Sequence, residues 1–396
     1  MKVEFLDLGK QPIANNFLEP KEGIGNEYQY HLTVNFDEET KLISLGYFVP
    51  PKMMFNDQYV YHSSMSTTMR THFAKAAFDF IHAFNPIKVL EIGSNDGVFI
   101  NHFPQSSTIA VEPCGNFAKI TADNGYFTYS EFWDLQLAAR INKEKGKQDL
   151  VFAANCMCHI QDLDDAFKAI ASILSPRGVF IFEDPSLLKM IERGSYDQIY
   201  DEHAHIFSIT ALQNLLEPHG LAIFRVHELT VHGGSNRVYV CPTGSRLVEQ
   251  SVHNQLVQEH SAGLDHLATY RSFASRVEQS RDQLVGLLKE LKKTGNKIVS
   301  YGATSKSTTV FNYCGITTDL IDYIVDTTPT KQGKLSPGMH IPVISPEEGF
   351  NESVDYAFLG AWNFKNEICK NESEFLKRGH FISHVPHVRI VDEYSS

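Results

Sequence analysis

The chain has 396 residues, of which 42% are hydrophobic and 21% charged; these values are typical of a folded protein and exclude a disordered one. Its 47 acidic residues outnumber the 35 Lys and Arg residues, giving a net charge of -12, so general nucleic-acid binding is not expected. The length exceeds what one hydrophobic core usually organises, and two or three domains are therefore expected.

Three further features bear on the compartment of the protein. No apolar run approaches the roughly 20 residues that a membrane-spanning helix needs. The opening MKVEFLDLGKQ lacks the basic segment and apolar stretch of a signal peptide. The six cysteines are scattered without a C-x-x-C pair, as in proteins of a reducing compartment. We therefore expect a cytoplasmic protein with no membrane partner and no disulfide framework.

The first two thirds of the chain predict two units. Residues 1–70 hold short, mixed segments separated by Gly and Pro, and predict a small N-terminal module. A helical apolar spacing follows over 71–84. Alternating strand and helix patterns over 71–245 then predict a Rossmann-like α/β domain with a doubly wound parallel sheet. The predicted strands lie at 87–92, 108–111, 150–154 and 178–182, a helix lies at 163–174, and strand material at 224–240 closes the sheet.

The last third predicts a connector and a second α/β unit. Residues 246–295 are polar-rich and amphipathic, as expected for a helical connector between two domains. After Gly295 the alternation resumes with the strand KIVSYG, a polar loop, a helix through 310–313 and the strand LIDYIVD. We therefore expect a smaller α/β domain over 296–396. Two α/β units suggest two separate ligands.

A glycine-containing loop follows the first strand of the central domain. Its glycines allow a tight turn and a close approach to a ligand at the carboxyl end of the strand. The spacing is not the dinucleotide pattern G-x-G-x-x-G; instead E-I-G-S-N-D-G is a degenerate form of the S-adenosylmethionine (SAM) motif. A purely structural turn is the alternative. The candidate cofactor residues here are Glu91, Gly93, Asn95, Asp96 and Gly97.

The next two strands end in residues that would complete a SAM site. The strand TIAVEP ends in Glu112 and Pro113, and a carboxylate there can accept hydrogen bonds from both ribose hydroxyls. The strand LVFAAN ends at Asn155. Because open parallel sheets bind ligands at the carboxyl ends of their strands, we expect Glu112, Pro113 and Asn155 to line the same cleft.

A polar, aromatic insertion at 197–207 follows the strand GVFIFED. Loops at the carboxyl end of a sheet strand commonly carry chemistry. His203 is the candidate general base because imidazole has the side-chain pKa nearest neutrality. Tyr200 and Glu202 are expected to orient it, and His159 to reach the same cleft. The alternative is that these histidines are structural.

Two other segments suit a polar, sugar-like ligand. Aromatic and hydroxyl side chains gather near the N-terminus in YVYHSS, a composition suited to a lid over a sugar. The segment HGGSNR has two glycines that permit close backbone approach. A solvated loop and a hairpin turn, respectively, are the alternatives. The candidate substrate residues are Tyr59, Tyr61, Ser63, Ser64, His232, Gly233, Ser235 and Arg237.

Six ordered motifs carry a resemblance that covers nearly the whole chain. They are FLDLGKQPIANNFL, YVYHSSMSTTMRTHF, VLEIGSNDGVFI, IYDEHAHIFS, HGGSNRVYV and YGATSKSTTVFNYCGI. The chain closely resembles the SAM-dependent nucleotide-sugar C-methyltransferases of deoxysugar pathways, whose members methylate C3 of 4-keto-6-deoxyhexoses. The resemblance implies an N-terminal zinc module, a central SAM domain and a C-terminal domain that helps bind the nucleotide sugar.

The sequence departs from this family at the zinc site, which two C-x-x-C pairs form in the family. The chain begins where the first pair would have ended, and Asp37 and Thr40 stand where the second is expected. We therefore predict that no metal is bound and that hydrophobic packing holds the N-terminal module instead.

The resemblance assigns His203 as the base that deprotonates the carbon next to the ketone, with Tyr200, Glu202 and His159 in the same pocket. The resulting enolate would attack the methyl group of SAM and leave S-adenosylhomocysteine. In the C-terminal domain, the loop 302–308 suits a pyrophosphate, because backbone N–H groups at a helix N-terminus bind anions; a plain helix cap is the alternative. The candidate residues there are Thr304, Ser305, Lys306, Ser307 and Asp326.

The predicted function is thus C3-methylation of a GDP- or dTDP-linked 4-keto-6-deoxy sugar. The alternatives are O- or N-methylation of a nucleotide sugar, a nicotinamide-dependent sugar oxidoreductase and an inactive sugar-nucleotide-binding protein. The sequence leaves open the nucleotide, the sugar stereochemistry, the donor to the enolate oxygen and the oligomeric state.

Overall fold

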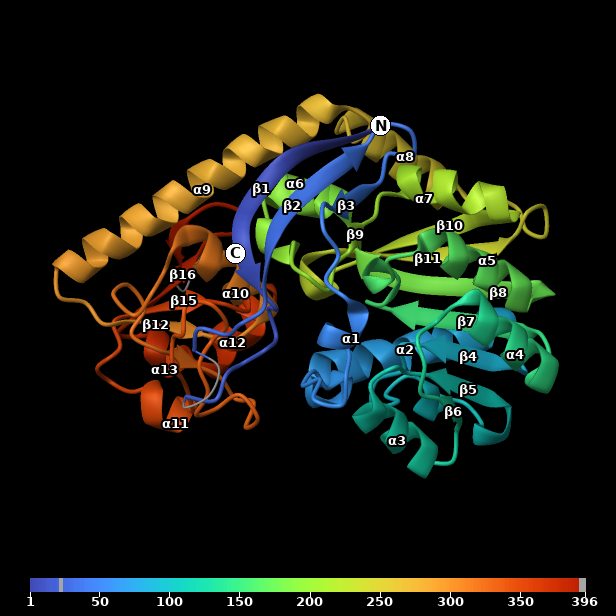
Figure 1. Cartoon of the computed structure of the whole chain (residues 1–396), viewed down its shortest axis with the longest axis horizontal. Helices are drawn as coiled ribbons and strands as arrows, with labels where there is room; N and C mark the ends of the chain where they lie inside the picture. The colour runs from blue at the N-terminus through green and yellow to red at the C-terminus, as the bar shows by residue number, and fades with distance from the viewer. Residues whose placement is uncertain (21–23, 392–396) are drawn as a thin grey trace.

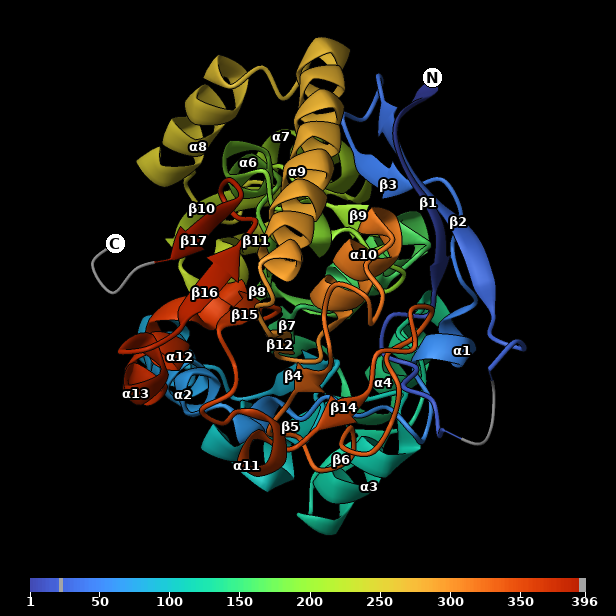
Figure 2. The ribbon, with the colours of Figure 1, turned by 90° about the vertical axis from the view of Figure 1, so that its left-hand side faces the viewer.

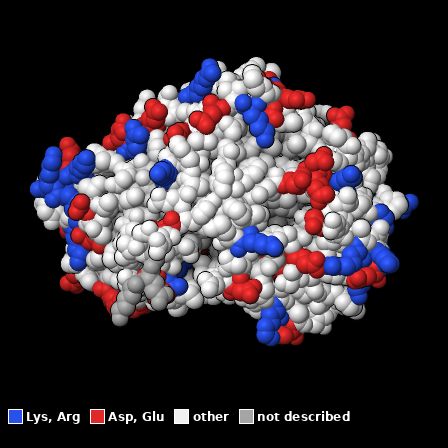
Figure 3. All heavy atoms as spheres, in the orientation of Figure 1, with Lys and Arg blue, Asp and Glu red and all other residues white. Residues whose placement is uncertain are grey.

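A computed structural model describes residues 1–20 and 24–391 (Figure 1). Two α/β units lie side by side, the N-terminal sheet lies at their junction, and the long helix α9 (Leu267–Lys293) runs from that sheet along the C-terminal unit (Figure 1). Acidic and basic side chains are interspersed over the face shown in Figure 3. Within the described ranges, every helix is too short or too polar to span a bilayer.

The central sheet has seven strands in the order β10-β11-β8-β7-β4-β5-β6. Strands β4 to β8 pair in parallel, and β11 and β10 join antiparallel at one edge, which confirms the Rossmann-like α/β prediction. The predicted closing strand 224–240 is a hairpin of two strands. The bounds are β4 (Val89–Ile92), β5 (Thr108–Val111), β6 (Phe127–Tyr129), β7 (Gln148–Ala154), β8 (Leu174–Pro185), β10 (Leu221–Leu229) and β11 (Ser235–Pro242).

Capping side chains mark where most helices of this domain begin. Helix α2 starts four residues before the predicted 71–84, because the Oγ of Ser66 accepts a hydrogen bond from the Met69 N–H (3.3 Å) and caps a polar first turn. The predicted division at residue 70 therefore falls inside this helix. The helices are α1 (Pro51–Met54), α2 (Thr67–Phe84), α3 (Gly115–Asp123), α4 (Leu135–Lys145), α5 (Leu163–Ile173), α6 (Leu187–Arg193) and α7 (Ile209–Leu216).

The N-terminal sheet contains β1 (Lys2–Pro12), β2 (Gln29–Asp37), β3 (Ile43–Leu45) and β9 (His205–Ile206), all antiparallel. Alternate residues of β2 are buried, as expected for a strand with one face on a core. Since β9 comes from the predicted catalytic insertion, this sheet is joined to the central domain. Tyr270 of α9 packs against Phe36 and Phe5, with ring centroids 4.7 and 5.1 Å apart.

The C-terminal unit has a six-stranded sheet in the order β14-β13-β12-β15-β16-β17, parallel except for β17 (Figure 2). The connector holds two helices, α8 (Gln250–Ser261) and α9. The remaining bounds are β12 (Ile298–Tyr301), α10 (Ser305–Cys314), β13 (Ile324–Val325), β14 (Val343–Ile344), α11 (Pro346–Gly349), β15 (Tyr356–Leu359), α12 (Lys365–Asn371), α13 (Ser373–Leu376), β16 (His380–Ser383) and β17 (Arg389–Val391).

Candidate active site

A cavity of about 490 Å³ lies where the three parts of the molecule meet. Side chains from the N-terminal module, from the carboxyl ends of β4, β5 and β7, and from the start of α10 all line it. The two expected ligand sites are therefore parts of one continuous cavity. The predicted residues that line it are Tyr59, Tyr61, Ser63, Gly93, Asn95, Glu112, Pro113, Asn155, His159, Tyr200, Glu202, His203, His232, Thr304, Ser305 and Lys306.

The loop after β4 forms one end of the cavity. Gly93 has a φ of +71°, and a Cβ there would lie 2.9 Å from the Sγ of Cys156, so a side chain is excluded on two grounds. The carboxylate of Glu112 accepts hydrogen bonds from the N–H groups of Asn95 and Cys114, each at 2.8 Å. Burial raises the pKa of Glu112, and these two donors oppose the shift.

Three predicted cofactor residues support this loop from outside the cavity. Glu91 is buried within β4, where burial and the neighbouring Glu112 raise its pKa. Asp96 accepts a hydrogen bond from the N–H of Ser64 (3.1 Å), a predicted substrate residue that also lies outside the cavity. Gly97 has a φ of +81°, which suits a glycine.

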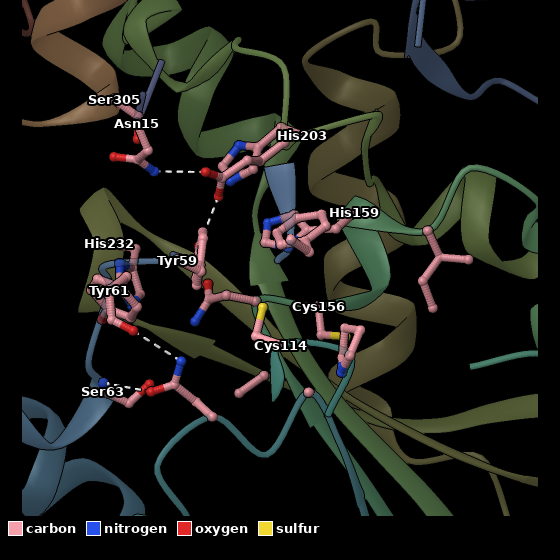
Figure 4. A pocket seen from close by; sticks show the side chains of 18 of the residues that line it. Asn15, Tyr59, Tyr61, Ser63, Cys114, Cys156, His159, His203, His232 and Ser305 are labelled. Atoms are coloured by element: carbon pink, nitrogen blue, oxygen red, sulfur yellow. Dashed lines mark hydrogen bonds between the residues drawn. The ribbon is translucent and has the colours of Figure 1, made fainter. Parts of the chain in front are cut away.

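The predicted lid segment is bonded directly to the cofactor loops (Figure 4). The side chain of Asn95 accepts from the Ser63 N–H and donates to the Tyr61 carbonyl, both at 2.9 Å. The amide of Asn116, at the start of α3, donates to the Tyr59 carbonyl (3.0 Å). The lid residues Tyr59, Tyr61 and Ser63 are therefore held in place by hydrogen bonds to the loop after β4 and to the start of α3.

His203 has the hydrogen bonds of a neutral imidazole in which Nδ1 is the donor and Nε2 the acceptor. Its Nδ1 lies 2.7 Å from the carbonyl of Gln198, which can only accept, so Nδ1 carries the proton. Its Nε2 lies 2.9 Å from the hydroxyl of Tyr200, which donates to it. Burial lowers the pKa of His203, and lowers that of His159, whose ring stacks on it at 5.4 Å, to about 4. Both imidazoles are therefore neutral near pH 7.

Glu202 accepts hydrogen bonds from two side chains of the N-terminal module (Figure 4). Its carboxylate accepts from the Nδ2 of Asn15 (2.6 Å) and the hydroxyl of Tyr59 (3.0 Å). Burial raises its pKa, while these donors and the ammonium of Lys331 oppose the shift. Asn15 and Lys331 line the cavity but were missed from the sequence. Asn15 lies in the motif QPIANNFL, whereas the loop around Lys331 gives no signal.

The loop after β12 lines the cavity from the C-terminal unit. Thr304 and Ser307 form a capping box at the start of α10, so the Ser307 side chain caps the helix. Lys306 lines the cavity; burial lowers its pKa, and the carboxylate of Asp197 opposes that shift. Asp326 lies outside the cavity and accepts from the Ala303 N–H (2.7 Å).

The segment HGGSNR contributes His232 to the cavity, and its other candidates bond within the protein. The Nε of Arg237 is 2.6 Å from the carboxylate of Glu183, a buried ion pair. The hydroxyl of Ser235 donates to the Val231 carbonyl (3.2 Å). Gly233 lies against the Trp362 indole, where any Cβ would clash. These residues support the turn that carries His232.

Comparison with known proteins places the chain in a family. Family models match over 61–226 (Methyltransferase domain), 230–386 (C-methyltransferase C-terminal domain) and 1–55 ("Putative zinc binding domain"). C-methyltransferase NovU from Streptomyces niveus is 32% identical over 401 residues, covering 100% of this chain and 95% of that protein. The chain belongs to the SAM-dependent C-methyltransferase family. The motif-based family prediction is thereby confirmed.

Solved methyltransferase structures show a weaker likeness to this C-methyltransferase. A SAM-dependent methyltransferase from Thermotoga maritima is 19% identical and covers 43% of this chain and 91% of its own, with a TM-score of 0.33. One from Anabaena variabilis is 14% identical over 45% of this chain and 86% of its own, with a TM-score of 0.36. At such scores the likeness adds nothing to the family assignment.

The N-terminal part of this C-methyltransferase does not fit a thiolate zinc site. Residues 1–55 contain no cysteine and one histidine, His31, whose Nε2 lies 2.7 Å from a carboxylate oxygen of Asp7. Among the described residues, the one group suited to hold a metal is Cys158, His159 and His203, whose donor atoms lie within 4.8 Å of one another. That group belongs to the cavity just described. The absence of bound zinc stays a prediction.

Proposed function

We propose that this C-methyltransferase uses S-adenosylmethionine to methylate C3 of a GDP- or dTDP-linked 4-keto-6-deoxy sugar. The observation that carries the proposal is the His203–Tyr200 contact, with its Nε2 to hydroxyl distance of 2.9 Å, in one cavity with the Gly93 loop and Lys306. A base between a methyl-donor site and an anion site matches what carbon methylation of a nucleotide sugar needs.

The residues at the Gly93 end fit S-adenosylmethionine. After accepting from two backbone N–H groups, the Glu112 carboxylate has lone pairs left for the ribose hydroxyls. Gly93 has no side chain and so leaves room for the ligand. The rings of Phe132 and Trp133 line the cavity and suit an adenine face. When bound, S-adenosylmethionine supplies an electrophilic methyl group.

The part of the cavity lined by the C-terminal unit suits the nucleotide diphosphate. Lys306 and Lys331 bring two ammonium groups to the cavity, and the first N–H groups of α10 lie beside Lys306. Cations and a helix N-terminus both stabilise phosphate oxygens. Tyr59 and Tyr61 supply aromatic faces for the sugar ring and help to exclude water.

Proton removal falls to His203. Its Nε2 takes the proton from C3, which the neighbouring 4-keto group makes acidic, and positive charge moves onto the imidazole. The Tyr200 hydroxyl, released from Nε2 by the substrate, then donates to the enolate oxygen. Burial raises the pKa of Tyr200, so this hydroxyl stays protonated and available as a donor.

The test is incubation with S-adenosylmethionine and a panel of 4-keto sugar nucleotides carrying deuterium at C3. We expect mass spectrometry to show one added methyl group together with loss of the C3 deuterium. A methylated product that keeps this deuterium would instead indicate O- or N-methylation. No methylation of any member of the panel would reject the proposal.

His203→Asn should lower kcat by about 10²- to 10⁴-fold, the usual contribution of a general base. Binding of S-adenosylhomocysteine should change less than about threefold, since His203 is assigned to the sugar. His205→Asn is the matched control, because this buried neighbour bonds the Gln161 carbonyl (3.2 Å) and lies outside the cavity. Equal losses in both variants would contradict the assignment of the base.

A further inference from the structure

The tautomer of the His203 imidazole depends on one backbone carbonyl, that of Gln198. Because the Gln198 carbonyl accepts from Nδ1 at 2.7 Å, it fixes the tautomer in which Nε2 is the proton acceptor. If that carbonyl moved away, Nδ1 would lose its partner and the ring could rotate or change tautomer. The contacts that hold Gln198 in place therefore control the candidate base.

Gln198 ends a single 3₁₀ turn, η5 (Tyr196–Gln198), which belongs to no sheet. All three side chains of the turn are at most 1% exposed. Within residues 1–20 and 24–391, the side-chain amide of Gln198 bonds only the hydroxyl of the neighbouring Ser195 (2.8 Å), a local contact. The long-range side-chain contacts of the turn are therefore those of Tyr196 and Asp197, and the hydroxyl of Thr309 in α10 donates to the carbonyl of Ile199 directly after it (3.3 Å).

The polar and ring contacts of Tyr196 and Asp197 are made with the C-terminal unit. The carboxylate of Asp197 accepts a hydrogen bond from the indole N–H of Trp362, and its other oxygen lies 3.6 Å from the Nε2 of His384. The ring of Tyr196 meets those of Tyr313 and His384 edge-on, with centroids 5.7 and 5.5 Å apart. The turn is thus docked on the C-terminal unit.

Asp197 lies outside the cavity lining but interacts electrostatically with Lys306 of the proposed diphosphate site. Its carboxylate favours the charged form of Lys306, which lines the cavity. Trp362 directly precedes Asn363 and Phe364, which line the same cavity. One buried carboxylate therefore connects the cation of the C-terminal unit with the turn that orients the base.

We propose that Trp362 and Asp197 are positioning residues for His203: the indole holds the carboxylate, the carboxylate holds the turn, and the Gln198 carbonyl fixes the tautomer of the base. The C-terminal unit then does more than bind the nucleotide, since it sets the geometry of proton removal. The kinetic consequence rests on the proposed function, whereas the structural one can be measured without any substrate.

Trp362→Phe keeps an aromatic ring and removes the indole N–H. We expect kcat to fall roughly 10- to 100-fold, as for a catalytic group displaced by about 1 Å, while binding of S-adenosylhomocysteine stays within about twofold. Asp197→Ala should behave alike. Asp197→Asn keeps an acceptor for the indole and should recover most of the turnover lost in Asp197→Ala, with KM still raised because Lys306 loses its counter-charge.

Tyr196→Phe is the matched control at the same interface. It keeps the ring contacts and removes only a hydroxyl 3.6 Å from the Sγ of Cys314, so kcat should stay within about threefold. If Tyr196→Phe lost as much turnover as Trp362→Phe, the effect would come from a loosened interface and the proposal would be overturned.

A spectroscopic measurement separates this inference from the proposed function. In protein with ¹⁵N-labelled histidine, the Nδ1–H signal assigned by its absence in His203→Asn should be present in the wild type. It should be lost or shifted in Trp362→Phe and restored in Asp197→Asn relative to Asp197→Ala. An unchanged signal in Trp362→Phe overturns the inference, whatever the substrate panel shows. If Asp197→Ala does not fold, Trp362→Phe alone decides.

Discussion

The loops after β4 and β12 share the same backbone arrangement at their first residues, but they bring different chemical groups to the cavity. The N–H of Gly93 donates to the Val111 carbonyl and that of Gly302 to the Val325 carbonyl, both at 2.8 Å. Both glycines have positive φ, +71° and +99°.

In each unit, a carboxylate directly after the next strand accepts a hydrogen bond from the loop and holds it in place. Glu112 accepts from the Asn95 N–H (2.8 Å) and Asp326 from the Ala303 N–H (2.7 Å). The two α/β units thus share one way of fixing a loop at the carboxyl end of a parallel strand.

The difference lies in the chain immediately after each glycine. After Gly302, α10 starts at once behind a capping box, which brings helix N–H groups and Lys306 to the cavity. After Gly93 the chain makes a turn, in which the Gly97 N–H donates to the Ser94 carbonyl (2.9 Å), before a short 3₁₀ helix at Ile100–His102. Glu112 itself lines the cavity. The same strand–loop start is thereby suited to an anion in one unit and to ribose hydroxyls in the other.

The sharpest test of this comparison removes each carboxylate in turn. Glu112→Ala should weaken binding of S-adenosylhomocysteine about 100-fold, because hydrogen bonds to a charged group worth about 3 kcal/mol in total are lost. Asp326→Ala should raise the KM of the nucleotide sugar only a few-fold, because Asp326 lies outside the cavity. Calorimetry and steady-state kinetics measure the two effects. A comparable loss in Asp326→Ala would mean that Asp326 contacts the ligand.

A smaller effect is expected from the cation of the second loop. Lys306→Met should raise the KM of the nucleotide sugar roughly 30-fold, about 2 kcal/mol for one charge-assisted contact to a diphosphate. Binding of S-adenosylhomocysteine should not change, since Lys306 is assigned to the other end of the cavity. Lys365→Met, in the C-terminal unit but outside the cavity lining, is the control. Loss of cofactor binding in Lys306→Met would break the proposed division of the cavity.

The pH dependence of the two ends should differ as well. Burial lowers the pKa of Lys306, so its positive charge is lost at a lower pH than that of an exposed lysine. The KM of the nucleotide sugar should therefore rise several-fold as the pH increases from about 8 to about 10, and the rise should vanish in Lys306→Met. Affinity for S-adenosylhomocysteine should stay level over this range. A KM that is independent of pH in the wild type would argue against Lys306 as the diphosphate cation.

The smallest expected effect is that of a chelator. Prolonged dialysis against EDTA should leave kcat and the unfolding temperature unchanged, because residues 1–55 contain no cysteine to form the family's zinc site. Metal analysis of the dialysed protein is the control. Loss of activity that zinc restores would show that other residues bind a metal.

Local sequence patterns predicted much of the fold and part of the site. An apolar run located β5 at 108–111, because burial on both faces of a parallel sheet leaves a clear signal. The helical pattern at 163–174 contains the whole of α5. Glycine spacing found the Gly93 loop, because positive φ at a tight turn is a local requirement. The family motifs brought Tyr200 and His203 together as a pair, which the 2.9 Å contact reproduces.

Other features were decided by packing between distant segments. Asn15 meets Glu202 across 187 residues, and Arg237 is paired with Glu183 although its motif suggested a ligand. Sequence patterns report periodicity and turn chemistry over a few residues. The partner of a buried charge, by contrast, is whichever opposite group the fold places beside it, since an unpaired buried charge is costly.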